Sequence, residues 1–270
     1  MDTLIHVFFN LDIMKQAFWV VLGAFPVSLI FGVTGFLLAI PGGLVLAFMK
    51  MAKTGIVRVV ATIYVDIVRG TPLALQILIL YFGLPLLPIY STIMAPLKGI
   101  EFLGINLTVY ARGLLILSLN SSAYLCEIFR AGIQSIPKGQ MEAARSLGLT
   151  RPQAMLYVIL PQTVRRILPT MMSEFILLFK DTALLASVSV MEMTLASKVI
   201  AGRLFNQSSY VIAACFYLVV TIPLGRVVSM LENKLAQSEG DAGKRPPMLR
   251  GLDSEHVTAH VENVLHPEKR

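Results

Sequence analysis

Long apolar runs without charge alternate with short charged segments along most of the chain. The first run, residues 16–49, holds no charged residue over 34 positions, and a helix needs only ~20 apolar residues to cross a bilayer. The second uncharged run is 71–97, and the transmembrane helix within it is expected to end near Pro85 or Pro88. Residues 50–69, before this run, are expected to form a polar connection. We predict five transmembrane helices, at 16–49, 71–97, 107–129, from near 167, and at 204–225.

Composition indicates an integral membrane protein and excludes an ordinary soluble domain. Hydrophobic residues make up 56% of the chain and charged residues 14%, and the mean hydropathy is +0.72. The predicted fold class is therefore an all-α membrane bundle. It occupies residues 16–235, after a short outer segment, 1–15. The tail, 236–270, is rich in charge, Gly and Pro and has little to bury, so we expect it to be disordered.

The longest polar interruption of the apolar pattern is residues 137–161, which we call the elbow. Pro137 suits the first turn of a helix, and Gly148 suits the left-handed position just past a helix end. The first helix then has about 11 residues, or ~16 Å. Thr150 can cap a second helix, with Gln153 three residues later completing a capping box. The elbow is thus predicted to be two short helices joined at a glycine.

The first elbow helix is predicted to carry an apolar face. Met141, Ala144, Leu147 and Gly148 share one side by their spacing of three and four residues. Glu142 lies near the helix start, where the helix dipole favours its charge and where it is free to pair with a basic residue of a partner. A helix this short is marginal in water, so something must pack on it. From the residues alone, the surface that packs on this helix is equally well its own bundle or a separate partner.

Basic residues gather on the elbow side of the predicted spans. Of the 23 Lys and Arg residues, 17 lie on that side, four lie on the other side and two lie within spans. Cytoplasmic loops carry the excess of basic residues. We therefore expect the elbow and the C-terminus to be cytoplasmic and the N-terminus to be outside. Topology explains the net charge of +7, so no nucleic-acid partner is predicted.

Charged residues inside the predicted spans are the candidates for transport chemistry. Glu174, Lys180 and Asp181 lie in the fourth span, where a charge at the bilayer centre costs roughly 2.5–3.5 kcal/mol. They are expected to face the bundle interior or water. Two interpretations are equally compatible with this pattern. In the first, these residues form a polar lining of a translocation path. In the second, they form a structural ion pair or lie near the membrane surface. Arg112, at the outer end of the third span, is expected to snorkel to headgroups more readily than to meet a substrate carboxylate.

Four motifs follow one another in a fixed order and spacing. They are Tyr64 with Arg69-Gly70-Thr71-Pro72, Ala123-Tyr124 with Glu127-Ile128-Phe129-Arg130, Glu142-Ala143-Ala144 with Gly148 and Val158-x-Leu160-Pro161, and Lys180-Asp181-Thr182 with Leu184. Together they resemble the permease subunits of ATP-binding cassette importers of the polar amino-acid uptake family, over about residues 20–235. The chain departs from that family at Val158, where Ile is usual, at Ala183, where Ser is usual, and in its long tail.

This resemblance implies a type I importer permease fold in the bacterial inner membrane, with a cytoplasmic coupling loop at about 131–165. The implied partners are an ATP-binding cassette ATPase dimer, a second permease subunit that is identical or homologous, an extracytoplasmic substrate-binding protein and membrane lipid. The implied coupling residues are Glu142, Ala143, Ala144, Leu147, Gly148 and Pro161, and the candidates for the translocation path are Glu174, Lys180, Asp181 and Thr182.

The chain has no glycine-rich phosphate loop ending in Lys-Ser or Lys-Thr, so we expect a transporter subunit whose ATP is hydrolysed by another chain. No cofactor or metal is predicted. The alternative is an ion-coupled secondary transporter that uses the charges of the fourth span, but five spans without a visible inverted repeat argue against it. A membrane-embedded enzyme would need a cluster of His, Asp and Glu at one depth, and His6 is the only His before the tail.

Overall fold

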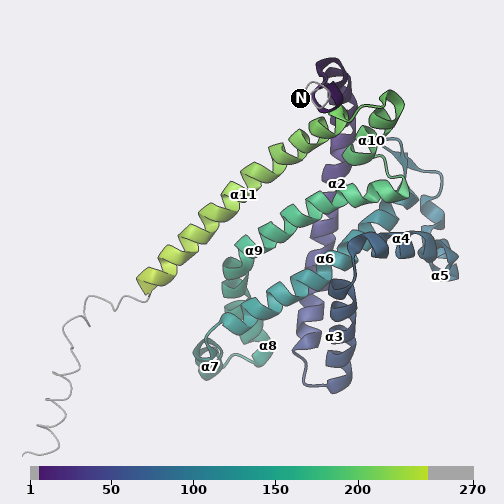
Figure 1. Ribbon diagram of the computed structural model, residues 1–270. Helices are drawn as coiled ribbons and strands as arrows, with labels where there is room; N and C mark the ends of the chain where they lie inside the picture. The colour runs from purple at the N-terminus through teal and green to yellow at the C-terminus, as the bar shows by residue number, and fades with distance from the viewer. Residues whose placement is uncertain (1–5, 243–270) are drawn as a thin grey trace, which may run out of the picture. The chain divides into compact units, whose positions relative to one another are not determined.

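The structure is a computed structural model that describes residues 6–242, with side chains described to residue 235 (Figure 1). It divides into two units, residues 1–228 and 229–270, and the second contributes the end of the last helix. The α-helices are α2 Leu11–Lys50, α3 Gly55–Gly70, α4 Leu73–Gly83, α5 Pro88–Met94, α6 Leu107–Ser135, α7 Lys138–Ser146, α8 Arg151–Ala154, α9 Leu160–Asp181, α10 Met193–Leu204 and α11 Ser208–Ala242. The shorter helical turns are the 3₁₀ turns η1 Leu84–Leu86, η2 Ala95–Leu97 and η4 Thr182–Val188, and the π-helical turn η3 Met155–Ile159. The strands are β1 Glu101–Phe102 and β2 Ile105–Asn106.

Within residues 6–242, three helices are long and apolar enough to cross a membrane alone, namely α2 with the turn before it, α6, and α11 as far as Leu235. Two bent pairs pass the same test together. One joins Gly55–Gly70 to Leu73–Leu86 at 112°, and the other joins Arg151–Val188 to Met193–Leu204 at 48°. Counting each pair as one span gives the five spans that the apolar pattern predicts, and the predominantly helical fold class is confirmed.

The prediction of a polar connection over residues 50–69 is wrong, because most of that segment is helix α3. Ile56, Val60, Ile63 and Ile67 recur at a spacing of three and four, so they form an apolar stripe whose side chains are all more than half exposed. The charges between them drew the sequence prediction away from this stripe.

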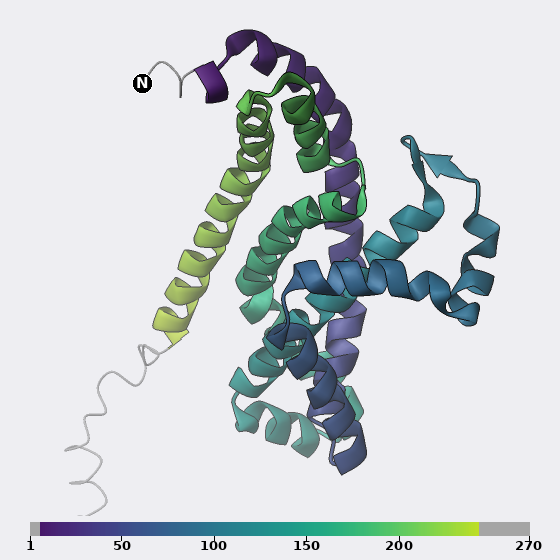
Figure 2. The same ribbon diagram turned by 45° about the vertical axis from the view of Figure 1, so that its right-hand side comes forward.

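The second span is broken where α3 meets α4, which Figure 2 shows as a sharp turn of the chain. Thr71 is extended there, with φ −119° and ψ 146°, because the ring of Pro72 disfavours the helical conformation in the residue before it. The predicted end of the span near Pro85 or Pro88 is confirmed, since α4 gives way to η1 after Gly83 and α5 begins at Pro88. A two-stranded hairpin, β1–β2, then leads into α6.

Other boundaries differ from the prediction by a few residues. Helix α6 begins at Leu107 as expected but continues six residues beyond 129, and the fourth span begins before 167 because α9 starts at Leu160. Helix α11 starts at Ser208 and runs to Ala242. The rest of the predicted tail, 243–270, lies outside the described residues.

Helix α6 is the central element of the first unit, because α2, α3, α4 and α9 all pack on it. Glycines allow two of these contacts to be close. A Cβ on Gly43 of α2 would lie 2.6 Å from Leu125 Cβ, and a Cβ on Gly132 of α6 would lie 2.2 Å from Ile167 Cγ2 of α9. The backbones therefore approach more closely than any larger residue permits at these two positions.

This packing predicts opposite outcomes for two substitutions in the same helix. Gly43→Ala should lower the stability of the protein by about 1–3 kcal/mol, because the new methyl group has to displace α6. Gly23→Ala is the matched control, since a Cβ there meets nothing within 4 Å and alanine favours the helix by up to about 1 kcal/mol. Thermal unfolding in detergent measures both. Equal midpoints for the two variants would contradict the close α2–α6 contact.

Candidate functional site

The first elbow helix, α7, is shorter than predicted but ends as predicted. Pro137 is the N-cap and not the first helical residue, so α7 has nine residues in place of about 11. Gly148 has φ +88°. The amide of Gly148 donates to the carbonyl of Arg145 at 3.0 Å, and the amide of Leu149 donates to that of Ala144 at 3.2 Å. This pair of bonds is a Schellman motif, which fixes the direction in which the chain leaves α7.

The second half of the elbow begins with the predicted capping box. Thr150 Oγ1 accepts a bond from the Gln153 amide, while Gln153 Oε1 accepts one from the Thr150 amide at 2.9 Å. Helix α8 has only four residues and passes through the π-helical turn η3 into α9. Pro161 lies at the start of α9 and has no amide hydrogen, so the wider turn before it leaves room for its ring.

The predicted apolar face of α7 is wrong at Leu147. Ala144 is buried, with 4% of its surface exposed, but Leu147 is 85% exposed. The helix ends at Ser146, so Leu147 occupies the C-cap with ψ near 9° and leaves the face that Ala144 occupies. Glu142 is the fifth residue of α7, beyond the first turn in which the dipole acts, so the predicted dipole stabilisation does not apply to it.

Two side-chain contacts lie around the elbow. Gln162, at the start of α9, donates to Gln140 of α7 at 3.2 Å. Arg166 of α9 donates from Nη1 to the carbonyl oxygen of Ser135, the last residue of α6, at 2.8 Å, so this bond joins the two helices that flank the elbow. Helix α7 packs on α8 and η3, which form the second half of the elbow, and its buried residue is Ala144. Glu142, Ala143 and Leu147 are exposed.

A polar seam crosses the bundle at the middle of α6, formed by three consecutive residues that each bond to a different helix. Asn120 Nδ2 donates to Gln76 Oε1 of α4 at 2.9 Å. Ser121 Oγ donates to Glu174 Oε1 of α9 at 3.0 Å. Ser122 Oγ lies 3.3 Å from the Tyr64 hydroxyl of α3, which donates to the carbonyl of Leu119 at 2.8 Å. Helices α3, α4 and α9 are thus connected through one short stretch of α6.

Gln76 also closes the break between α3 and α4, a role that the sequence prediction missed. Its Nε2 donates to the carbonyl of Val68 at 2.7 Å and lies 2.8 Å from Thr71 Oγ1. Carbonyls at a helix end need such partners, above all in a membrane. The signal in the sequence is that Gln76 is the one polar side chain in the apolar segment 73–80.

The charges of the fourth span are not paired with one another. Glu174 is 8% exposed and bonds to Ser121, so the alternative of an ion pair within the span does not apply to it. In the described part of the chain, Lys180 and Asp181 form no ion pair either; Lys180 is exposed and Asp181 is half-buried. The α-helix ends at Asp181, and buried Thr182 begins the 3₁₀ segment η4. This motif therefore marks the change from α-helix to 3₁₀-helix within the span.

Glu192 is a second polar residue that the sequence prediction missed. It is fully buried and caps α10, with its carboxylate accepting bonds from the amides of Leu195 at 2.7 Å and Thr194 at 2.9 Å. The Tyr217 hydroxyl of α11 donates to it at 3.1 Å. Glutamate is not among the favoured N-cap residues, so no local sequence rule predicts this role.

Arg112, for which the sequence predicts snorkelling to headgroups, contacts helix α4. Its guanidinium lies 4.4 Å from the centre of the Tyr81 ring and within 3.4 Å of the Tyr81 carbonyl oxygen. A cation over an aromatic face is a favourable contact, so the side chain turns into the bundle towards α4.

An ion-pair cluster joins α2 to α6. Glu127 Oε1 lies 2.6 Å from Lys50 Nζ, at the end of α2, and Glu127 Oε2 lies 2.6 Å from Arg130 Nη2. The three residues hold the end of α2 against the part of α6 that leads to the elbow. The sequence motif contains Glu127 and Arg130, but Lys50 is 77 residues away from Glu127.

Helices that are long and apolar enough to cross a membrane, a helical elbow at one end and polar side chains between the helices are features that fit a membrane permease. The chain belongs to the family described as binding-protein-dependent transport system inner membrane component, whose sequence model matches residues 39–237. It is therefore a transporter component and not an enzyme.

Relatives with similar sequences agree with this family. The chain is 33% identical over 228 residues to the probable amino-acid permease protein YxeN of Bacillus subtilis, covering 84% of this chain and 96% of the relative. It is 36% identical over 197 residues to the probable glutamine ABC transporter permease protein GlnM of the same organism, covering 73% and 84%. These matches rule out the alternative of an ion-coupled secondary transporter.

Solved structures show the same fold. A chain from the crystal structure of an amino acid ABC transporter with histidines matches with a TM-score of 0.69 and 32% identity, covering 83% of this chain and 98% of that one. An inward-facing structure of the MetNI methionine ABC transporter matches with a TM-score of 0.55 and 16% identity, which supports the fold alone. The type I importer permease fold expected from the motifs is confirmed.

The Glu127 cluster predicts a specific loss of stability. Glu127→Ala should destabilise the protein by about 1.5–3 kcal/mol, because it leaves the ammonium of Lys50, whose side chain is only 15% exposed, without its partner. Glu101→Ala, at an exposed position in β1, is the matched control and should leave the unfolding midpoint unchanged. If both variants unfold at the wild-type temperature, the cluster does not hold α2 to α6.

Proposed function

We propose that this chain is the permease subunit of an importer for a polar amino acid, and that its elbow couples transport to ATP hydrolysis by a separate ATPase subunit. The observation that carries the proposal is the geometry of α7. The Schellman motif at Gly148 and the capping box at Thr150 fix both sides of the turn, while Glu142, Ala143 and Leu147 remain exposed for a partner.

The attachment of the elbow supports a coupling role. Gln162 links α7 to the start of α9, Arg166 joins the start of α9 to the end of α6, and Gly132 allows these two helices to approach closely. Helices α6 and α9 also carry the Ser121–Glu174 hydrogen bond of the polar seam. A displacement of α7 by an ATPase would therefore be passed through packed helices to the polar groups between the spans.

The family supports the remaining partners of this proposal, and the charge pattern supports its orientation. In this proposal the permease works with an ATPase dimer, a second permease subunit that is identical or homologous, and an extracytoplasmic substrate-binding protein. The excess of basic residues on the elbow side supports a cytoplasmic elbow and C-terminus, with the N-terminus outside. The names of the relatives, amino-acid and glutamine permeases, support a polar amino acid as the substrate.

The translocation path is proposed to pass the junction of α9 with η4, where the α-helix changes to a 3₁₀-helix before the 48° bend that separates Val188 from Met193. Many transporters bind substrate where a membrane span is interrupted. Glu174 lies two turns before this junction, and Lys180, Asp181 and Thr182 lie at it.

The first test of the proposal is a substitution at the elbow glycine. Gly148→Ala should cost about 1–2 kcal/mol locally, because an L-residue is strained at φ +88°, and it should redirect α8 relative to α7. We expect weaker retention of the ATPase and loss of ATP-driven uptake in proteoliposomes. Gly139→Ala is the matched control, since it lies in α7 with open space around its Cβ position and an ordinary φ.

The same assay separates contact from geometry. Glu142→Ala keeps the fold of the elbow and removes an exposed charge, so it should weaken ATPase binding or separate hydrolysis from uptake without changing membrane insertion. If Gly148→Ala retains full ATPase binding and full uptake, the elbow has no coupling role, and the proposal is wrong in this part.

The second test concerns the junction of α9 with η4. Lys180→Ala and Asp181→Ala should each lower uptake or substrate-stimulated ATPase activity of an assembled complex. The loss of ~1.4 kcal/mol of interaction with the substrate would weaken its apparent affinity about tenfold. Lys198→Ala, an exposed lysine of α10, serves as the control. Normal transport by both junction variants would exclude these residues from the path.

A further inference from the structure

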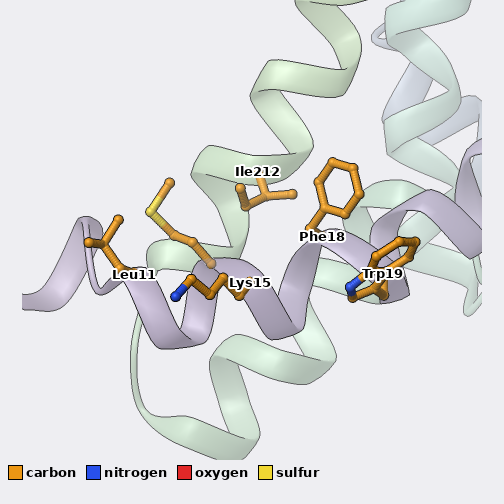
Figure 3. A pocket seen from close by; sticks show the side chains of 6 residues that line it. Leu11, Lys15, Phe18, Trp19 and Ile212 are labelled. Carbon is orange, nitrogen blue, oxygen red and sulfur yellow. The ribbon is translucent and has the colours of Figure 1, made fainter.

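An open groove of about 260 Å³ lies between the beginning of α2 and the beginning of α11 (Figure 3). None of the roles described above involves this groove. Its walls are almost entirely apolar, with one cation at the edge. The lining residues are Leu11, Met14, Lys15, Phe18, Trp19 and Ile212.

The groove combines an apolar floor with two polar groups that point outward. Phe18 packs against the Phe216 ring of α11, with centroids 5.4 Å apart, and edge-on against Trp19 at 5.3 Å. Lys15 and Trp19 are four residues apart, so they lie one turn from each other on the same side of α2, as Figure 3 shows. Although Trp19 is a large aromatic residue next to these rings, 72% of its surface is exposed.

Both polar groups are available for a ligand. Within the described part of the chain, neither the ammonium of Lys15 nor the indole N–H of Trp19 has a hydrogen-bond or ion-pair partner. Asp12, one turn before Lys15, lies in the first turn of α2, where its charge interacts favourably with the amide end of the helix.

The position of the groove along the chain places it at one end of the first span. Lys15 is the last charged residue before the 34 uncharged residues of that span, so it lies on the headgroup side of the residues that cross the hydrocarbon region. Trp19 follows four residues, or ~6 Å, further in. Tryptophan is enriched at this level of a bilayer, where its ring contacts acyl chains and its N–H reaches polar headgroup atoms.

We propose that this groove binds an anionic phospholipid. The phosphate of the headgroup pairs with the Lys15 ammonium and accepts a hydrogen bond from the Trp19 indole. One acyl chain lies along Phe18 and Ile212 between α2 and α11. Charge complementarity selects the ligand, because Lys15 is the one charged residue among those that line the groove, and its charge is positive.

The chain contains a single tryptophan, which makes the groove its own reporter. The full chain is reconstituted in phosphatidylcholine bilayers, and brominated phosphatidylglycerol or brominated phosphatidylcholine is added in rising proportion while the Trp19 fluorescence is recorded. Bromine quenches at short range, so quenching measures occupancy of the groove. We expect the anionic lipid to bind about fivefold more tightly than the zwitterionic lipid, the ratio expected for one lysine at an anionic headgroup.

Matched variants decide between this site and a general surface charge. Lys15→Gln should reduce the affinity ratio to about one, whereas Lys98→Gln, which removes an exposed lysine outside the groove, should leave it unchanged. Equal quenching of the wild-type protein by the two lipids would overturn the proposal. So would the same loss of selectivity in Lys98→Gln as in Lys15→Gln, because the preference would then come from total charge.

Discussion

The interior of a membrane offers no water to polar side chains, and the arrangement of helices around α6 satisfies this constraint. Asn120, Ser121 and Ser122 each find a partner on a different neighbouring helix. Because an unpaired polar group in an apolar medium costs several kcal/mol, none of these helices can shift independently without loss. The seam therefore fixes the rotation of α3, α4 and α9 about their own axes, which apolar packing alone leaves weakly determined.

The elbow depends on the same helices. It follows α6 and precedes α9, and the close contact at Gly132 joins those two helices just before α7 begins. The hydrogen bonds of the Schellman motif and of the capping box join neighbouring residues within the elbow, so they fix the angle between α7 and α8. A rigid segment that is attached at both ends to the helices of the polar seam can transmit force, whereas a flexible loop of the same length would absorb it.

Features that depend on a few neighbouring residues could be predicted from the sequence, and features that depend on helix packing could not. Gly148 and the Thr150–Gln153 capping box follow from rules that operate within one turn. The Asn120–Gln76, Glu127–Lys50 and Tyr217–Glu192 contacts join residues 44, 77 and 25 positions apart, and the period of a helix does not specify its neighbour. Helix α3 was missed for a different reason, since its charges obscured its apolar stripe.

The two broken spans have a common physical solution. At the α3–α4 break, Gln76 bonds to the freed carbonyl of Val68, and at the η4–α10 break, Glu192 accepts the freed amides of Thr194 and Leu195. A break whose backbone groups are bound by side chains is stable in lipid without continuing the helix. Such a break can also change its angle through the backbone dihedrals of a few residues, whereas an unbroken helix such as α6 has to move as one body. We therefore expect α6 to be the fixed member of the bundle and the two broken spans to be the members that move against it.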